Sequence, residues 1–397
     1  MTGRGSSCYI WLCLLVLGLT PVATAQTIAV HDVEELYAAV NNPANAGAAL
    51  LLSPGTYLLS VNDPGEVPRP NGGRIEVQPD MSIRGVEGDR SAVVINASNL
   101  PASSFPNGGT IGPNAAVRIG LGYNSLEWLT VRDATFAQAN IDTGLQPLDP
   151  GPAVVRIAHV ASTGSTRGLN VLNFGAATSG QTIRGEIVDC YFFDNIWNVS
   201  EGVRIGNFQG AHNSTVDLIM SENLSWGQKQ GRLLVNNRAV DSTVRVVSSG
   251  NRFYDNGAGT IVLGGLSSNE TRADGNRIDF EAHGDQFFNN QRVVEFDQGG
   301  LVVLGSENIS VTGGASHNVV HVSLWGPRIA GNGTADLTAI GARWTSPTAA
   351  GLSENNHVTI EVRGDGDARS KWQPVEFSAD TVPSGPTYGN TAAIIRY

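Results

Sequence analysis

The chain has 397 residues, with 25 basic against 36 acidic side chains and a formal net charge of −11. Hydrophobic residues make up 41% and charged residues 15%, which excludes an intrinsically disordered chain, because disorder needs low hydrophobicity together with high charge. The acidic balance argues against a broad nucleic-acid-binding surface, which needs a basic face. Three cysteines are too few for a disulfide-rich scaffold.

Residues 1–25 have the pattern of an export signal. Arg4 supplies a positive charge, Ile10 to Leu19 is apolar, and Ala23-Thr24-Ala25 has the form of a small-residue cleavage site. The apolar run is about half of the ~20 residues that a membrane-spanning helix needs. We therefore expect a secreted protein, extracellular or periplasmic, with no membrane partner. Residues 26–397 would form a single mature domain.

The first elements of that domain are a short helix and two strands. The sequence from Val33 to Val40 has helical periodicity, and Leu50-Leu51-Leu52-Ser53 is an apolar strand that ends at Pro54-Gly55-Thr56-Tyr57. Met81-Ser82-Ile83-Arg84-Gly85 has the pattern of a further strand. From about residue 115 onward the pattern changes to short β-rich runs broken by Gly, Asn, Asp and Ser.

An internal repeat organises residues 181–332. Five segments of fifteen residues align without gaps, and they begin 28 to 42 residues apart. The segments are QTIRGEIVDCYFFDN (181–195), STVDLIMSENLSWGQ (214–228), STVRVVSSGNRFYDN (242–256), NRIDFEAHGDQFFNN (276–290) and NVVHVSLWGPRIAGN (318–332).

Two columns of this alignment indicate a β-solenoid. Alternate residues of a strand share a face, so the aliphatic third position of each segment should point inward. The last position is an amide in every segment, and stacked amides can hydrogen-bond to one another. The aliphatic column is Ile183, Val216, Val244, Ile278 and Val320. The amide column is Asn195, Gln228, Asn256, Asn290 and Asn332.

These features, with the opening helix, strand and Pro-Gly-x-Tyr turn, resemble the pectin lyase-like superfamily. The resemblance implies an all-β fold, a single-stranded right-handed parallel β-helix with a short N-terminal capping helix. It also implies a polysaccharide as partner. The motifs of polygalacturonase-like hydrolases are incomplete, because Ala282-His283-Gly284 and Arg328-Ile329-Ala330 stand in place of Gly-His-Gly and Arg-Ile-Lys. The resemblance therefore predicts the fold more specifically than the chemistry.

The densest polar strand is Asp279 to His283. Strand alternation puts Asp279, Glu281 and His283 on its outer face, with one basic neighbour of Asp279 on each adjacent coil and a tryptophan beside His283. Two carboxylates two residues apart on a strand are about 6.6 Å apart at Cα, which suits the pair of an inverting glycosidase. The predicted catalytic residues are Asp279, Glu281 and His283, and the predicted substrate-binding residues are Arg245, His321 and Trp325.

The same outer face also has simpler interpretations. Its charged column, Arg184, Asp217, Arg245, Asp279 and His321, alternates in sign and would serve as a plain charge ladder. A carboxylate–histidine cluster could instead hold a divalent metal ion. The sequence requires no cofactor, and calcium is the one metal ion that this cluster could bind.

A second candidate site is a basic stripe. Arg118, Arg156 and Arg204 each lie between two aliphatic residues that should point inward, so each arginine should face outward. The resemblance to pectate lyase-like enzymes implies an arginine or lysine base near acidic calcium ligands. If the three strands are in register, the three arginines form one stripe; otherwise they only contribute to solubility.

Two functions follow from these observations. The first is a secreted, monomeric protein that recognises, and in one version cleaves, a polysaccharide along one face of the solenoid. A cleaving version would be a polysaccharide lyase or a glycoside hydrolase. The alternative is a non-catalytic surface, adhesion or structural protein.

Overall fold

The computed structural model describes most of the chain after residue 25. The described residues are 26–100, 115–134, 139–143, 151, 153–195, 200–268, 270–290, 299–309, 312–333, 335–344, 351–364, 372–379 and 387–397. The predicted export signal, residues 1–25, lies outside them. No helix in the described part of the chain is both long and apolar enough to span a membrane.

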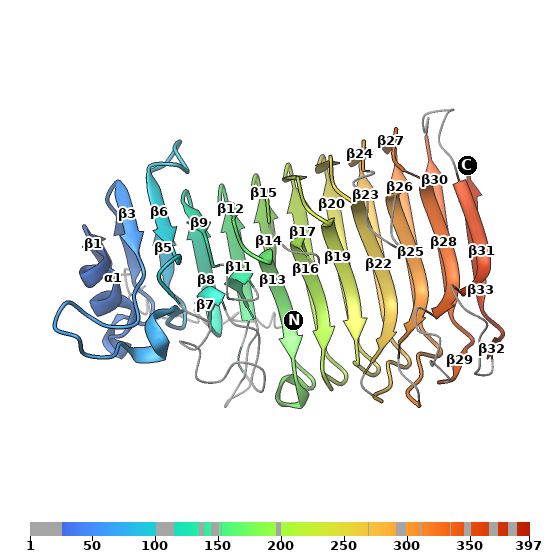
Figure 1. Cartoon of the computed structure of the whole chain (residues 1–397), viewed down its shortest axis with the longest axis horizontal. Coiled ribbons are helices and arrows are strands. Elements are labelled where there is room, and N and C mark those ends of the chain that lie inside the picture. Colours follow the sequence, from blue (N-terminus) through green and yellow to red (C-terminus); the bar gives the residue numbers. More distant parts are fainter. Residues whose placement is uncertain are drawn as a thin grey trace, which may run out of the picture.

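Within the described residues, nearly all strands join three long parallel sheets, one strand of each per coil. Figure 1 shows the coils following one another along the long axis, from the N-terminal to the C-terminal end. The all-β parallel β-helix predicted from the repeats is confirmed.

The strands of sheet 1 are, in spatial order, β1 (Thr27–Val30), β2 (Ala49–Leu52), β5 (Ser82–Arg84), β8 (Gly122–Glu127), β11 (Ala153–Ala158), β14 (Thr182–Val188), β17 (Thr215–Ser221), β20 (Thr243–Ser249), β23 (Arg277–His283), β26 (Val319–Trp325), β30 (His357–Arg363) and β33 (Thr391–Arg396). Those of sheet 2 are β3 (Gly55–Leu58), β6 (Val93–Asn96), β9 (Thr130–Arg132), β12 (Ala161–Thr163), β15 (Tyr191–Phe193), β18 (Leu224–Trp226), β21 (Arg252–Tyr254), β24 (Gln286–Phe288) and β27 (Arg328–Ala330).

The strands of sheet 3 are β4 (Ile75–Val77), β7 (Ala115–Ile119), β10 (Ala139–Asp142), β13 (Arg167–Phe174), β16 (Glu201–Phe208), β19 (Gln230–Asn237), β22 (Ala258–Ser267), β25 (Gly299–Asn308), β28 (Ala335–Trp344) and β31 (Trp372–Ala379). A separate pair is β29 (Ser353–Glu354) with β32 (Thr387–Tyr388). Short 3-10 turns are η1 (Pro43–Asn45), η2 (Pro70–Gly73) and η4 (Ala176–Thr178).

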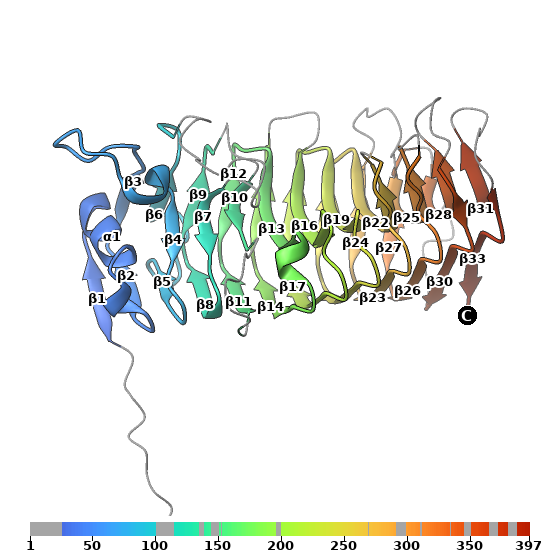
Figure 2. The ribbon, with the colours of Figure 1, turned by 90° about the horizontal axis from the view of Figure 1, so that it is seen from below.

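Helix α1 (Val33–Val40) covers the N-terminal end of the solenoid (Figure 2). Asp32 caps it, because its side chain accepts a hydrogen bond from the Glu35 backbone N–H at 2.9 Å. Leu36 and Val40 are fully buried against the first coils. The helix therefore shields apolar core that would otherwise end in water.

The predicted inward column of sheet 1 is confirmed. Ile183, Val216, Val244, Ile278 and Val320 are direct partners on successive strands, and each is at most 1% exposed. The amide column is confirmed as well. The Asn256 side-chain amide donates to Asn290 Oδ1 at 3.1 Å, and that of Asn290 donates to Asn332 Oδ1 at 2.9 Å. These bonds satisfy polar groups buried in the turn after sheet 2.

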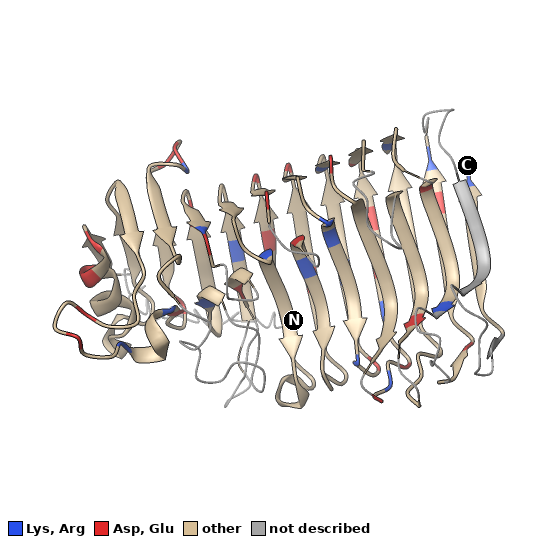
Figure 3. Ribbon diagram, in the orientation of Figure 1, with Lys and Arg blue, Asp and Glu red and all other residues tan. Residues whose placement is uncertain are grey.

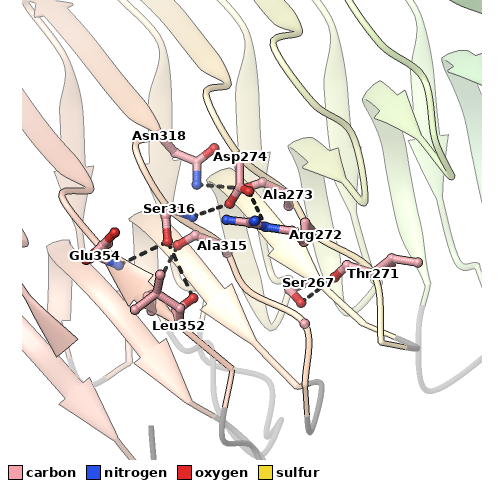
Figure 4. A network of polar contacts seen from close by, with 12 residues as sticks. Ser267, Thr271, Arg272, Ala273, Asp274, Ala315, Ser316, Asn318, Leu352 and Glu354 are labelled. Atoms are coloured by element: carbon pink, nitrogen blue, oxygen red, sulfur yellow. Dashed lines mark hydrogen bonds and ion pairs between the residues drawn. The ribbon is translucent and has the colours of Figure 1, made fainter. Parts of the chain in front are cut away.

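A second amide ladder closes the turn between sheets 3 and 1. Asn276 donates to Asn318 at 3.0 Å, and Asn318 donates to Asn356 at 2.9 Å. Figure 4 shows the polar contacts around this ladder. They include the Arg272–Asp274 ion pair and the hydrogen bond that the Ser316 backbone N–H donates to the Asp274 carboxylate. Partial burial raises the pKa of Asp274, although these two contacts oppose the shift.

The solenoid interior also contains an ion pair. Arg232 of β19 points inward and is completely buried, and its Nη2 lies 3.3 Å from Oδ2 of the equally buried Asp285. The guanidinium carbon lies 4.6 Å from the centroid of the Phe253 ring and 4.5 Å from that of Phe280. Its neighbours in the same column, Val203 and Thr260, are uncharged, so this pair is a local departure from an apolar core.

An aromatic row runs along the outer face of sheet 2. The rings stack nearly parallel, at centroid distances of 4.6, 5.7 and 5.4 Å in succession. Its members are Phe193, Trp226, Tyr254 and Phe288. Because each ring covers the face of the next, the row presents edges rather than open faces to solvent.

Candidate functional site

The predicted site residues lie on the outer face of sheet 1. Asp279 of β23 has Arg245 of β20 and His321 of β26 as direct strand partners. His283 has Trp325 as its partner on β26. The alignment therefore predicted the neighbours of each residue correctly. Charged residues also occur on other strands along the solenoid, as Figure 3 shows.

A depression of about 250 Å³ hollows this face over strands β17, β20, β23 and β26. Its floor is partly apolar, since Val247 is 43% exposed; the strand partner of Val247, Ile219, is 54% exposed beside the depression. The lining residues are Asp217, Arg245, Val246, Val247, Asp279, Phe280, Glu281, His321 and Ser323.

The two charged groups at the β17–β20 end of the depression are open to a ligand. Within the described part of the chain, neither Asp217 nor the Arg245 guanidinium has a hydrogen-bond partner. The side chain of Arg245 is 58% exposed, and its Nε lies 3.9 Å from Asp279 Oδ2, which is too long for a hydrogen bond. Exposed charges held beside an apolar floor can bind a ligand without losing an existing contact.

Asp279 is engaged differently. Its two carboxylate oxygens accept from Nε and Nη2 of Arg277, each at 2.6 Å. This bidentate pair fixes the carboxylate and raises the pKa of Arg277. Asp279 is therefore placed as an anchored acceptor at the centre of the depression.

Glu281 and His283 form a second pair, with 2.8 Å between Glu281 Oε1 and His283 Nε2. The two side chains are 48% and 45% exposed. A catalytic carboxylic acid needs a site that excludes water, so that it keeps its proton at neutral pH. The half-exposed side chain of Glu281 does not lie in such a site.

Trp325 has no open ring face. His283 stacks at a centroid distance of 5.9 Å from the preceding coil, and the Arg363 guanidinium lies 4.6 Å from the ring centroid from the following coil. Arg363 also pairs with Glu361 at 2.8 Å, which lowers the pKa of Glu361. The tryptophan is part of a stacked column, and a sugar ring could meet only its edge.

The described residues contain no group of three or more His, Cys, Asp or Glu arranged to hold a metal ion. His321 Nε2 lies 3.7 Å from Glu361 Oε1 and does not converge with Glu281 and His283. The carboxylate and histidine side chains thus pair separately.

The alternative basic stripe is not formed. Arg118 and Arg204 share one column of sheet 3, separated by Asp142 and Asn170, whereas Arg156 lies on sheet 1. Each arginine also meets a carboxylate, which leaves no continuous positive strip: Arg118 with Glu76 at 3.9 Å, Arg156 with Glu127 at 3.2 Å, and Arg204 with Glu201. Burial lowers the pKa of Arg204 to about 10.

Sequence reasoning assigned neither Asp217 nor Val247 to the site. Asp217 stood in the same charged column as Arg245, so the alignment could have included it. Val247 stood at an outward position of the same alternation, two residues after Arg245, so the alignment could have included it as well; the structure shows it 43% exposed in the depression.

Comparison with family models finds no match, and comparison with curated proteins finds none. Solved structures with similar coils include pectate lyase Pel9A, at 14% identity and a TM-score of 0.39, covering 91% of this chain and 80% of that chain. The mannuronan C-5 epimerase AlgE4 A-module of Azotobacter vinelandii has 14% identity, a TM-score of 0.35 and coverage of 90% and 100%. PfbA, a surface adhesin of Streptococcus pneumoniae, has 10% identity, a TM-score of 0.33 and coverage of 91% and 91%.

The chain has a three-sheet parallel β-helix fold. At these identities and TM-scores, the similarities carry no argument about activity. The function must be argued from the outer face of sheet 1 itself.

Proposed function

We propose that this protein is secreted and binds a polysaccharide along the outer face of sheet 1. The sugar chain would cross strands β17, β20, β23 and β26, which span about 14 Å at the ~4.8 Å spacing of neighbouring strands. The observation that carries the proposal is the depression, in which Val247 lies exposed between Arg245, Asp279 and Glu281.

This combination suits the two surfaces of a sugar ring. The C–H groups of a pyranose can pack on an apolar floor, while its hydroxyl groups need both donors and acceptors. Arg245 can only donate, and ionised Asp217 can only accept. Neither has a hydrogen-bond partner among the described residues, so a ligand hydroxyl would add bonds rather than replace them.

Recognition fits the geometry better than cleavage does. Asp279 is held by Arg277 in a bidentate pair, and Glu281 is exposed and paired with His283. Neither carboxylate lies in the water-excluding site that a general acid needs. A protein that binds a polysaccharide without cleaving it could also serve as an adhesin along the same face.

The first experiment is a screen of the full chain against a panel of soluble polysaccharides. Retardation in affinity gels would detect binding, while new reducing ends and the ultraviolet absorbance of unsaturated products would detect cleavage by hydrolysis or elimination. We expect binding without either product. Absence of binding to every member of a broad panel would contradict the proposal.

Comparing Glu281→Gln with Arg118→Gln then locates the site. We expect the Glu281 change to weaken binding by about tenfold, since a hydrogen bond to a charged group contributes ~1.5–3 kcal/mol. Folding stability should change by no more than about 0.5 kcal/mol, because the residue is exposed. Loss of binding only with the Arg118 change would move the site to sheet 3.

A further inference from the structure

From the charges of the depression we infer that the site selects neutral glycans and rejects polyuronates. This inference rests on the proposed function and adds the substrate class to it. The lining contains three carboxylates, Asp217, Asp279 and Glu281, against one guanidinium, Arg245. A uronate chain would bring one further negative charge with every sugar to a lining in which carboxylates outnumber guanidinium groups.

Two of the nearby cations are committed to the protein's own carboxylates, and a third, the exposed Arg184 on β14, is the strand partner of Asp217 and lies outside the lining. Arg277 uses two N–H groups on Asp279, and Arg363 pairs with Glu361 while it covers the Trp325 ring. Recognition of a uronate carboxylate typically needs an arginine whose two parallel N–H groups are open. Among the described lining residues, Arg245 alone offers such a group.

Hydrogen-bond direction leads to the same result. The carboxylates of Asp217, Asp279 and Glu281 accept hydrogen bonds and cannot donate when ionised. A hydroxyl group can donate to them, whereas a uronate carboxylate cannot. Along the column Asp217, Arg245 and Asp279, acceptor and donor alternate from coil to coil, which matches the dual character of hydroxyl groups.

The remote charge of the chain adds little to this selection. The formal net charge is −11, but at physiological ionic strength charges beyond about 8 Å are largely screened. Selection must therefore come from the lining itself. Removing its negative charges should weaken the rejection of a polyuronate.

The test uses two forms of one backbone that differ in charge. Fully methyl-esterified polygalacturonan is neutral, and its de-esterified form carries a carboxylate on each sugar. Binding of the full chain to both forms, and to neutral glucan, xylan and mannan, would be measured by calorimetry at 0.15 M and 0.5 M salt. At 0.15 M salt, we expect at least one neutral glycan to bind at least tenfold more tightly than the de-esterified polymer. The affinity for the neutral glycan should change little between 0.15 M and 0.5 M salt.

The variant Asp217→Asn/Glu281→Gln should narrow the gap between the two charge forms, while Arg252→Gln, exposed on the outer face of sheet 2, should leave it unchanged. Tight binding of the de-esterified polymer in preference to every neutral glycan would overturn this inference and leave the proposed function standing. Absence of binding to all of these polymers would remove both.

Discussion

The interior ion pair gives the sharpest test of how the solenoid is held together. Arg232→Met would leave Asp285 as a fully buried carboxylate with the Ser248 hydroxyl at 2.5 Å and the Asn251 backbone N–H at 3.0 Å, but without its countercharge. Removing one partner of a buried pair costs about 3–5 kcal/mol, because the remaining charge is uncompensated. Loss of the contacts with Phe253 and Phe280 acts in the same direction.

The matched variant is Asp285→Asn, which keeps an oxygen acceptor for Asn251 and leaves the Arg232 charge unpaired. We expect a similar loss for this variant, and near wild-type stability for Arg232→Met/Asp285→Asn, in which both charges are gone. Chemical denaturation of the four proteins would give the coupling energy. Single variants that each unfold within about 0.5 kcal/mol of the wild type would refute the reasoning.

Two further predictions concern the turns. Asn290→Ala removes a buried amide that donates to Asn332 and to the Phe253 carbonyl, at 2.9 Å each. The free energy of unfolding should fall by about 1–3 kcal/mol. An unchanged midpoint of chemical denaturation would mean that the amide ladder does not stabilise the fold. Because burial raises the pKa of Asp274 above its usual 3.8, the stability it contributes is present below that value and is lost as pH rises through the folded-state pKa. Asp274→Asn should therefore gain thermal stability relative to the wild type as the pH rises above about 4, and a relative loss on that side would show the opposite sign.

The repeat alignment predicted the fold correctly because one coil constrains the next. Ile183 and Val216 had to share a column if both were to be buried, and Asn290 had to meet Asn332 if both amides were to be satisfied. Such periodic requirements are visible in one sequence. They also placed Asp279 between Arg245 and His321.

Arg156 shows where this reasoning ends. The pattern Val-Arg-Ile buries two aliphatic residues and exposes the arginine on any strand of the solenoid, so it does not distinguish sheet 1 from sheet 3. Before residue 181 the loops vary in length, and the alignment could not assign the sheet. The structure places Arg118 and Arg204 on sheet 3 and Arg156 on sheet 1. The sheet of each strand depends on the path of the whole coil, which the local pattern does not contain.

Sequence reasoning predicted the face and the strand neighbours of the candidate residues, but not their side-chain contacts. Alternation placed Glu281 and His283 outside, yet it could not show that they pair with each other. It placed Trp325 beside His283, but not Arg363 over the other side of the ring. Both contacts depend on side-chain conformations, which the alternation of a strand does not specify.

The most direct test of the binding surface compares two arginines that differ in location alone. Arg245→Gln removes the open guanidinium of the depression, and Arg252→Gln removes an exposed guanidinium from sheet 2. The dissociation constant of the best polysaccharide would be measured for the wild type and both variants. A rise of about tenfold or more for Arg245→Gln, with no change for Arg252→Gln, is the predicted result. Equal affinity of all three proteins would contradict the assignment of sugar binding to sheet 1.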